Sequence, residues 1–414
     1  MTQDSRINAV LFAVDCGEYD MQSSISELSA LADANNIDAV AEIIQKRDAP
    51  DAATYIGEGR AEEGRMYCIN LEAEIAIFDA ELSGSQIRNL EEVLGVRVID
   101  RTMLILEIFA KRAVSNEGKL QTELAELRYR LPRLAGLGAS MSRQGGGGGG
   151  GGGARRGAGE SRLEYDKRHI KRRIEALEER LEEMEKRRGE TRKAREKSGV
   201  PIIALVGYTN VGKSSLLNKL CGADTMAADM LFATLDPTVR KLTLPSGLAC
   251  VAVDTVGFVS RLPHGLVNAF KSTLEEAAYA DIILKICDAS DEKSHEQQIV
   301  TDAVLAELHC EDIPQITVYN KCDKLNAALF NSEAMLTSAV TGEGLCQLLA
   351  AVDKLLSDRV RRINILLPYD KLSLAAPMRT RGTVLCEEYR DDGVYFEGIV
   401  KAMDLHLYNE FLVL

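Results

Sequence analysis

Apolar runs of strand length alternate with segments of helical periodicity through the first part of this chain. Strands separated by helices in this way are typical of a parallel sheet, because each crossover needs a helix to return the chain. We therefore predict a small α/β domain with a parallel sheet over residues 1–115. Its strand-like runs are 9–14, 39–44, 74–78 and 96–99, and its helical segments are 23–34 and 85–94.

Two long helical patterns follow, at 120–133 and 163–197. In the second, apolar residues recur at spacings of seven, four and three, which predicts a coiled-coil seam. We expect the two helices to pack as an antiparallel pair within residues 116–198. The seam residues are Leu163, Ile170, Ile174, Leu177, Leu181 and Met184.

An uninterrupted glycine run, Gly145–Gly153, separates the two helices, with Arg143, Arg155 and Arg156 beside it. Glycine loses much entropy on ordering and buries no side chain, so one interpretation is a flexible linker. In the other, the tip orders against RNA, because bare backbone can approach closely and the arginines can meet phosphates. Both interpretations stay open here.

Residues 199–358 carry the clearest chemistry. The apolar run 202–206 leads into the glycine-rich segment 207–214, and a helical pattern follows at once. In this order, backbone N–H groups and the helix N-terminus face a phosphate chain. Lys213 is then placed to reach the β- and γ-phosphates, and the Ser214 hydroxyl to hold Mg²⁺. The segment predicts a nucleoside triphosphate site.

A second motif, Asn-Lys-Cys-Asp at 320–323, follows a strand-like run and selects the base. Substrates in open α/β sheets bind at the carboxyl ends of strands. The Asp323 carboxylate can accept hydrogen bonds from guanine N1–H and N2–H₂, a donor pair that adenine lacks. Lys321 can lie over the base, and Asn320 can tie this loop to the phosphate loop. We therefore predict GTP.

Three further segments complete a GTPase pattern. After an apolar run, Asp254 can hold Mg²⁺ through water, and the Gly257 N–H can sense the γ-phosphate. Upstream, Thr234 can complete the Mg²⁺ coordination while the γ-phosphate is present. Ser338 and Ala339 resemble the strand-end loop that touches guanine O6.

We predict Lys213, Thr234 and Gly257 as catalytic residues, with Ser214, Thr234 and, through water, Asp254 as Mg²⁺ ligands. The residues expected to bind GTP come from five segments and are Gly207, Tyr208, Thr209, Asn210, Val211, Gly212, Lys213, Ser214, Phe232, Ala233, Thr234, Leu235, Asp236, Asp254, Thr255, Val256, Gly257, Asn320, Lys321, Cys322, Asp323, Ser338 and Ala339.

Phe258 follows the glycine of the Asp-x-x-Gly pattern, where many GTPases have a glutamine that orients the attacking water. A phenyl ring cannot form that hydrogen bond, so we expect slow hydrolysis until a partner completes the site. His264 lies nearby in sequence and can act on water, although a histidine after proline is more often structural.

Asn210 is a candidate K⁺ ligand. In the potassium-activated GTPases an asparagine of the phosphate loop helps to hold K⁺ near the β–γ bridge, where the cation does the electrostatic work of an arginine finger. The alternative is that Asn210 merely fits the loop.

Segments beyond the nucleotide motifs carry further recognisable sequence: YIGEGR at 55–60, IDRT at 99–102, GKLQ at 118–121, LFATLDPT at 231–238, LPHGLVNAF at 262–270 and TLEE at 273–276. With the motifs above, they resemble the HflX branch of the translation-factor-related GTPases over nearly the whole chain. The resemblance implies a cytoplasmic GTPase that binds the large (50S) ribosomal subunit and its 23S rRNA and splits stalled or idle ribosomes under stress.

The resemblance also bears on the remaining parts of the chain. In the family, the loop between the two helices reaches toward the peptidyl-transferase region, and proline usually stands at the position of Ala158. Residues 359–414, with strand-like runs near 364–369, 382–388 and 393–396, read as a small α+β domain, to which the resemblance gives a ribosome-facing role. The N-terminal region has been linked in the family to a second nucleotide activity. Here the stretch 57–59 lacks the third glycine of a dinucleotide fingerprint and reads better as a turn before a helix, which leaves ATP use open.

Composition sets modest limits. The nine cysteines form no Cys-x-x-Cys pair, which favours free thiols over disulfides or zinc sites. Tryptophan is absent and aromatic residues are few, which argues against a stacking platform for single-stranded nucleic acid. No apolar stretch approaches the length of a membrane span. The net charge of −13 is unusual for a ribosome binder, but Arg and Lys are concentrated between 155 and 197. A solvated helical face accounts equally well for that concentration.

Two other classes of function remain compatible with these motifs. One is a GTP-gated factor that assists assembly of the large subunit without separating mature ribosomes. The other is a non-ribosomal regulatory switch that binds a protein in its GTP form. We expect a monomer in either case.

Overall fold

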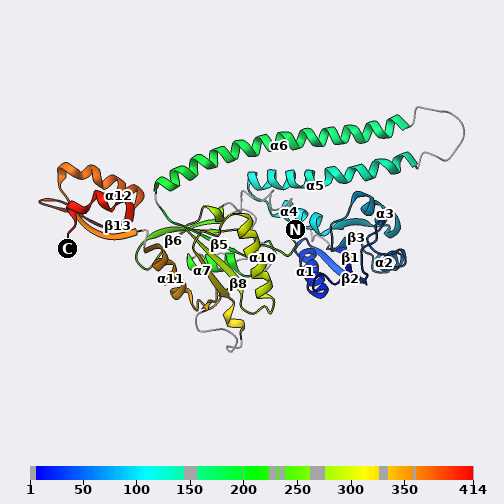
Figure 1. The fold of residues 1–414 in the computed structure, drawn as a ribbon, viewed down its shortest axis with the longest axis horizontal. Coiled ribbons are helices and arrows are strands. Elements are labelled where there is room, and N and C mark those ends of the chain that lie inside the picture. The colour runs from blue at the N-terminus through cyan, green and yellow to red at the C-terminus, as the bar shows by residue number, and fades with distance from the viewer. Residues whose placement is uncertain are drawn as a thin grey trace. The chain divides into compact units, whose positions relative to one another are not determined.

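The computed structural model describes residues 6–143, 156–198, 200–222, 231–232, 238–261, 276–325, 334–357 and 360–413 (Figure 1). The glycine run lies outside these residues. The chain divides into two compact units. The first contains Met1–Glu183 with Met230–Phe232 and Leu262–Phe270, and the second contains Met184–Asp229, Ala233–Arg261 and Lys271–Leu414.

The first unit begins with a four-stranded parallel sheet, as the alternation of strands and helices predicted. Its strand order is β2-β1-β3-β4, and every pair is parallel. The strands are β1 (Ile7–Asp15), β2 (Ile37–Lys46), β3 (Ile75–Phe78) and β4 (Arg97–Asp100). The helices are α1 (Met21–Ala34), α2 (Glu58–Asn70), α3 (Gly84–Leu94) and α4 (Arg101–Arg112).

Helix α4 was not predicted, and α2 was expected only as a helix of unspecified length after residues 57–59; each conceals its periodicity in a different way. α2 buries Ala61, Gly64 and Cys68, so its inner stripe consists of small residues. A Cβ atom on Gly64 would stand 2.6 Å from the ring of Phe12, which explains why nothing larger fits. α4 is buried over most of its surface, so it shows no alternation of apolar and polar faces.

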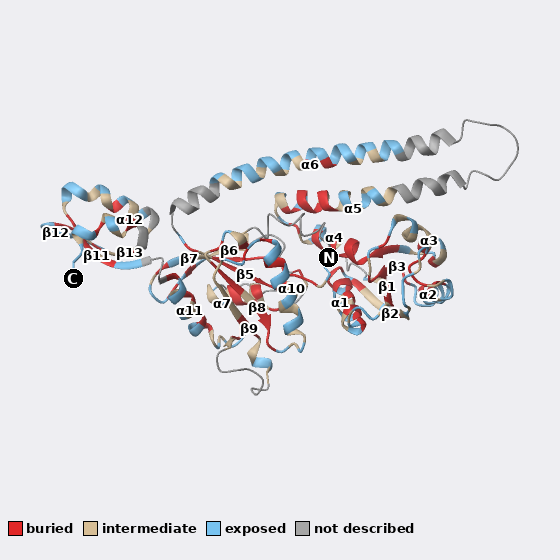
Figure 2. Cartoon of the chain, in the orientation of Figure 1, coloured by how far each residue is buried: buried red, intermediate tan, exposed pale blue. Residues whose placement is uncertain are grey.

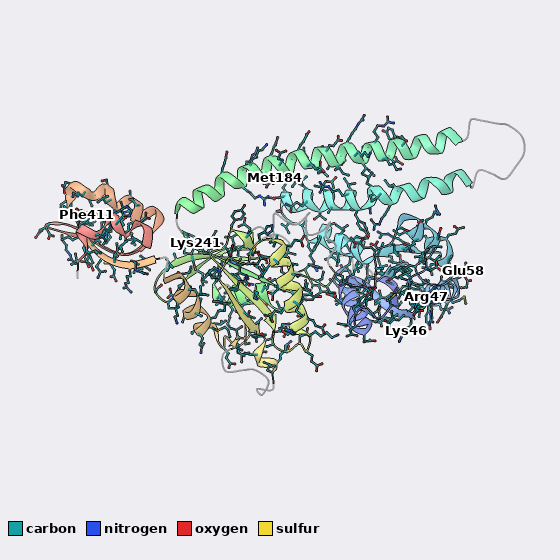
Figure 3. The ribbon with its side chains drawn as sticks, viewed as in Figure 1. Lys46, Arg47, Glu58, Met184, Lys241 and Phe411 are labelled. Carbon is teal, nitrogen blue, oxygen red and sulfur yellow. The ribbon has the colours of Figure 1, made fainter. Side chains whose placement is uncertain are left out.

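The helix expected after 57–59 is present but begins earlier, at Glu58, with Gly57 as its N-cap. Its N–H donates to Gln45 Oε1 over 2.9 Å. A Cβ atom at Gly57 would stand 2.9 Å from Arg47 Nη1. The lack of a side chain at Gly57 therefore leaves room for the Arg47 guanidinium beside the start of the helix. Figure 3 labels Arg47, just past the end of β2, and Glu58, the first residue of α2.

A buried ion-pair group joins the elements at the carboxyl end of this sheet. Arg101 is 3% exposed. Its Nη1 lies 2.9 Å from Asp79 Oδ1, and its Nη2 lies 2.6 Å from Glu27 Oε2. Ser24 Oγ donates to Asp79 as well, over 2.5 Å. Because two carboxylates neutralise one buried guanidinium, the start of α4 is held to α1 and to the end of β3.

The first of two long helices is anchored to the sheet through Asp100. This carboxylate accepts hydrogen bonds from the backbone N–H groups of Leu82 and Met103, and from the Tyr129 hydroxyl. Burial raises the pKa of the Asp100 carboxyl. Burial and the nearby carboxylate also raise the pKa of Tyr129, so the phenol remains a donor.

Those helices are α5 (Asn116–Arg143) and α6 (Arg156–Ser198). Ion pairs join Arg128 to Glu178 over 2.6 Å and Arg173 to Glu123 over 2.7 Å. Figure 1 shows the two helices lying side by side and running in opposite directions, in agreement with the predicted antiparallel pair. α5 extends beyond the predicted end near 133. Pro132 lies inside the helix and removes one backbone donor, but it does not end the helix.

The second unit contains a six-stranded sheet in the order β10-β9-β8-β5-β7-β6. β6 pairs antiparallel with β7, and the other pairs are parallel. The strands are β5 (Ile202–Gly207), β6 (Thr238–Thr243), β7 (Ala249–Asp254), β8 (Ile282–Asp288), β9 (Gln315–Asn320) and β10 (Met335–Leu336). The helices described with it are α7 (Lys213–Leu220), α10 (Ser294–Glu307) and α11 (Leu345–Ser357).

The last part of the second unit is a three-stranded antiparallel sheet in the order β11-β13-β12. Its strands are β11 (Val360–Leu367), β12 (Thr383–Arg390) and β13 (Gly393–Lys401), with α12 (Ala375–Arg381) packed beside them. Ile365, Phe396 and Tyr408 are fully buried in its core. The predicted α+β character is confirmed, and Figure 2 shows the burial concentrated in the strands of each sheet.

All nine cysteines lie in the described part of the chain as free thiols. Within the same residues, no helix is both long and apolar enough to cross a membrane.

Candidate functional site

The phosphate-loop segment forms the tight connection that its glycines predicted. β5 ends at Gly207, and α7 begins at Lys213, with Gly212 as its N-cap at φ +90°. A Cβ atom on Gly207 would stand 2.2 Å from the Ile286 carbonyl oxygen, and one on Gly212 would stand 2.4 Å from Asn320 Nδ2. Neither position admits a side chain, so the loop keeps a close approach to β8 and to the end of β9.

Lys213 is buried beneath this loop and 6% exposed. Its Nζ donates to the carbonyl oxygens of Gly207, over 3.1 Å, and Tyr208, over 2.7 Å. Loss of solvent lowers the pKa of Lys213 to about 8, although the negative charge of Asp254 opposes that shift. A nearby polyphosphate would therefore stabilise the charged form of this lysine.

We expect GDP binding to be accompanied by proton uptake at alkaline pH. Above pH 8 the free Lys213 side chain is largely neutral, and the bound phosphates raise its pKa, so binding takes up a proton. GDP affinity should accordingly fall as the pH rises through 8. Calorimetry in two buffers of different ionisation enthalpy measures the uptake. It should vanish in Lys213→Arg, whose guanidinium stays charged, and uptake that persists in this variant would assign the proton elsewhere.

Ser214 and Asp254 form the part of the site that fits Mg²⁺. Ser214 Oγ donates to Asp254 Oδ2 over 2.6 Å, and Asp254 is fully buried at the end of β7. No group of three or more acidic, histidine or cysteine side chains capable of holding a metal occurs in the described segments. Mg²⁺ in nucleotide sites needs few protein ligands, because phosphates and water supply the rest. A hydroxyl and a carboxylate beside the phosphate loop suit that role, and bound Mg²⁺ would neutralise charge on the β- and γ-phosphates.

Gly257 and Phe258 are joined to the phosphate loop by backbone hydrogen bonds. The Thr209 N–H donates to the Phe258 carbonyl oxygen over 2.7 Å, and the Phe258 N–H donates to the Gly207 carbonyl oxygen over 3.1 Å. Thr255, also a predicted site residue, donates from Oγ1 to the Leu205 carbonyl oxygen over 2.7 Å and so has a structural partner. These bonds hold the Asp-x-x-Gly segment against the phosphate loop.

The base-recognition segment is fastened to the same loop. Asn320 Nδ2 donates to the Val211 carbonyl oxygen over 2.9 Å, as predicted, and its Oδ1 accepts the Ala339 N–H over 3.1 Å. Lys321 Nζ donates to the Asn210 carbonyl oxygen and also lies 2.7 Å from Asp288 Oδ2.

Asp323, the predicted base-reading residue, is held from the opposite side. Its Oδ1 accepts a hydrogen bond from Ser338 Oγ over 2.6 Å. Residue 338 belongs to the segment predicted to face guanine O6, and the Cys322 N–H donates to the Thr337 carbonyl oxygen in the same place. The two segments are therefore joined to each other by these hydrogen bonds.

The domain models of one family match the chain in order. Residues 22–110 match "GTP-binding GTPase N-terminal" and 112–195 match "GTP-binding GTPase Middle Region". Residues 202–321 match "50S ribosome-binding GTPase", and 325–401 match "HflX C-terminal domain". The GTPase HflX of Caldanaerobacter subterraneus is 46% identical over 387 residues, which cover 93% of this chain and 89% of that protein. The chain belongs to the HflX family of GTPases.

HflX proteins from distant bacteria show the same extent of similarity. The GTPase HflX of Escherichia coli is 40% identical over 88% of this chain and 86% of its own length. A solved GTP-binding protein of Sulfolobus solfataricus in complex with GDP covers 84% of this chain and 98% of its own, at 26% identity and a TM-score of 0.45. The HflX relatives and the matching domain models confirm the predicted family and GTPase activity, and the enzyme converts GTP and water into GDP and phosphate.

Most of the predicted site residues that the structure describes lie together around the phosphate loop. Phe232 belongs to the first compact unit, where its ring meets that of Phe109 edge-on at a centroid distance of 4.6 Å. Ala233, Thr234, Leu235, Asp236 and His264 lie outside the described residues. The functional roles of all these residues remain predictions.

Asp288 is a site residue that the sequence analysis missed. It ends β8 and lies 2.7 Å from Lys321 Nζ, while its Oδ1 accepts hydrogen bonds from the backbone and hydroxyl of Ser290. Its position at the carboxyl end of a buried strand could have identified it as a site residue, because Asp254 was identified by the same kind of position.

Proposed function

We propose that this HflX GTPase binds the large (50S) subunit in the cytoplasm and splits stalled or idle 70S ribosomes under stress. The observation that carries the proposal is the match of the nucleotide-binding residues, 202–321, to a 50S ribosome-binding GTPase, flanked by HflX-type regions on both sides. The GTP-bound form acts on the ribosome, and hydrolysis then permits release.

The buried position of Phe258 supports a requirement for the ribosome in catalysis. The ring is 1% exposed, and both backbone polar groups of the residue are engaged by the phosphate loop. The residue thus offers no group to orient the attacking water. Intrinsic hydrolysis is slow, and the ribosomal particle accelerates it by ordering the loops around the γ-phosphate, with Thr234 completing the Mg²⁺ site.

The helical pair supplies a surface for 23S rRNA. Arg168, Lys171 and Arg172 are exposed on α6, so positive side chains project into solvent although the whole chain carries a charge of −13. Their contacts to phosphate would weaken as salt rises, because binding releases counterions from the RNA.

The decisive experiment follows GTP hydrolysis with no ribosomes, with 30S, with 50S and with intact 70S, together with 70S dissociation by light scattering. Strong stimulation by 50S or 70S, with loss of the 70S signal in GTP or a non-hydrolysable analogue, is the expected result. Binding to immature 50S without splitting of mature 70S would favour an assembly factor instead. If no particle changes hydrolysis or scattering, the function lies with a protein partner.

We also propose K⁺ activation through Asn210. Its side chain is exposed, and its backbone is left-handed at φ +59°, a conformation that asparagine tolerates well. Hydrolysis should be faster in K⁺ than in Na⁺ at equal ionic strength, by about tenfold, because a bound cation stabilises charge at the β–γ bridge. Asn210→Gly keeps the left-handed backbone and should lose the difference. Equal rates of the unaltered protein in the two salts would refute K⁺ activation and leave the backbone fit as the reason for asparagine.

A further inference from the structure

Among the residues that the structure describes, no side chain on the Phe258 side of the site has yet been assigned to position the terminal phosphoryl group in the GTPase reaction. Phe258 is buried, and its carbonyl oxygen and N–H are bonded to Thr209 and Gly207. Those two bonds continue the parallel pairing of β5 with β7 by one isolated bridge between Tyr208 and Phe258. The bridge brings Thr209, which follows Tyr208, close to Gly257, which precedes Phe258.

Thr209 lies directly against Gly257. A Cβ atom built on Gly257 would stand 2.8 Å from both Thr209 Cα and Thr209 Cγ2, and 2.9 Å from Lys213 Nζ. The Thr209 side chain, the Gly257 backbone and the ammonium that meets the phosphates therefore line one small volume. The γ-phosphate must occupy this neighbourhood if the Gly257 N–H is to sense it.

The Thr209 hydroxyl is buried without a partner. The residue is 5% exposed, and its Oγ1 makes no hydrogen bond within the described structure. A buried hydroxyl left unbonded costs roughly 1–3 kcal/mol, so such groups are uncommon in folded proteins. A valine of nearly the same shape would avoid that cost, and the presence of threonine therefore indicates a partner that arrives with the substrate.

The neighbouring polar groups are already engaged. Ser214 Oγ donates to Asp254, and Lys213 Nζ donates to the carbonyl oxygens of Gly207 and Tyr208. Thr209 thus contributes a neutral donor that is buried before the nucleotide binds, and a preformed donor needs no reorganisation during the reaction.

We propose that the Thr209 hydroxyl is a catalytic donor, which hydrogen-bonds a non-bridging oxygen of the γ-phosphate as the transition state forms. In that step the oxygen of water bonds to the γ-phosphorus, and the bond from phosphorus to the β–γ bridging oxygen breaks. The bridging oxygen stays with GDP, and both protons of water end on inorganic phosphate, which exchanges them with solvent. Threonine keeps its own proton and stabilises the charge on the transferred group. The proposal rests on the GTPase activity and is independent of the ribosome.

The test compares three substitutions by single-turnover GTP hydrolysis without ribosomes. Thr209→Val removes the hydroxyl and keeps the shape, Thr209→Ser keeps the hydroxyl and removes the methyl group, and Thr209→Ala removes both. Hydrolysis should fall about tenfold to a hundredfold in the valine and alanine variants, which is the usual cost of losing a hydrogen bond to a charged group. The serine variant should stay within about threefold of the unaltered rate.

Ligand affinities separate this role from a packing role. GDP binding should change little in all three variants, whereas binding of GDP with aluminium fluoride, a mimic of the transferred phosphoryl group, should weaken with loss of the hydroxyl alone. Ser246→Ala, in the turn between β6 and β7 where Ser246 contacts Asp353, is the matched hydroxyl-loss control. Hydrolysis at the unaltered rate in either valine or alanine would overturn the proposal. So would an equal loss in serine and valine, which would assign the effect to the methyl group.

Discussion

Asp323→Asn is expected to change the nucleotide preference from GTP to xanthosine triphosphate. The carboxylate accepts from guanine N1–H and N2–H₂, and an asparagine amide instead offers a donor to the C2 carbonyl of xanthine. Affinity for GTP should fall by about a hundredfold or more, because guanine then leaves a donor unpaired in the pocket. Direct calorimetric titration of the variant and the unaltered protein with each nucleotide measures this change of preference.

Two features make the experiment specific. Asp323 is held by Ser338 through a hydroxyl that can also donate to an amide oxygen, so the substituted side chain can keep its position. The control is Asp312→Asn, which makes the same change of charge at an exposed carboxylate beyond α10, away from the site. If Asp323→Asn still prefers GTP, another group reads the base, and the assignment of Asp323 is wrong.

Gly257→Ala is expected to stop hydrolysis while leaving GDP binding nearly intact. The new methyl group would stand 2.8 Å from Thr209 Cα, which is backbone and cannot turn aside, and 2.9 Å from Lys213 Nζ. The Asp-x-x-Gly segment must then retreat from the phosphate loop. A displacement of about 1 Å in a catalytic group costs about a hundredfold in rate, which sets the expected loss in single-turnover hydrolysis.

The matched control is Gly59→Ala in α2, where a Cβ atom would meet nothing within 4 Å. It should hydrolyse GTP at the unaltered rate, because the methyl group meets no neighbour and alanine favours a helix. Near-normal hydrolysis by Gly257→Ala would show that the segment lies farther from the phosphate loop during the reaction than it does in this structure.

The nucleotide site could be predicted because its chemistry is local in sequence. The segments 207–214 and 320–323 each combine a strand end with residues whose side chains or glycines have few other uses. The bond from Asn320 to the phosphate loop followed from placing two strand ends at one edge of a sheet, and the structure contains it. Asp288 fell outside the prediction because it bonds to a lysine distant in sequence and belongs to no short motif.

The parts that escaped prediction depend on packing between distant segments. α2 packs on its sheet through small residues, because the Phe12 ring fills the space next to Gly64. In the sequence, a helix face made of small residues is difficult to distinguish from a loop. The ring of Phe232 packs on that of Phe109, a pairing that local sequence does not encode. That the Thr209 hydroxyl is buried without a hydrogen-bond partner likewise depends on the packing around it, and no sequence motif predicts it.

The bonds between the base-recognition segment and the phosphate loop bear on how long a nucleotide stays bound. Asn320 and Lys321 each donate to a carbonyl oxygen of that loop, so the two ends of the nucleotide are gripped by segments fastened to each other. Neither the base nor the phosphates can leave first without straining the other segment. We therefore expect GDP to dissociate in one step in which both segments give way together. A partner that hastens exchange has its most direct route in separating Asn320 and Lys321 from the loop.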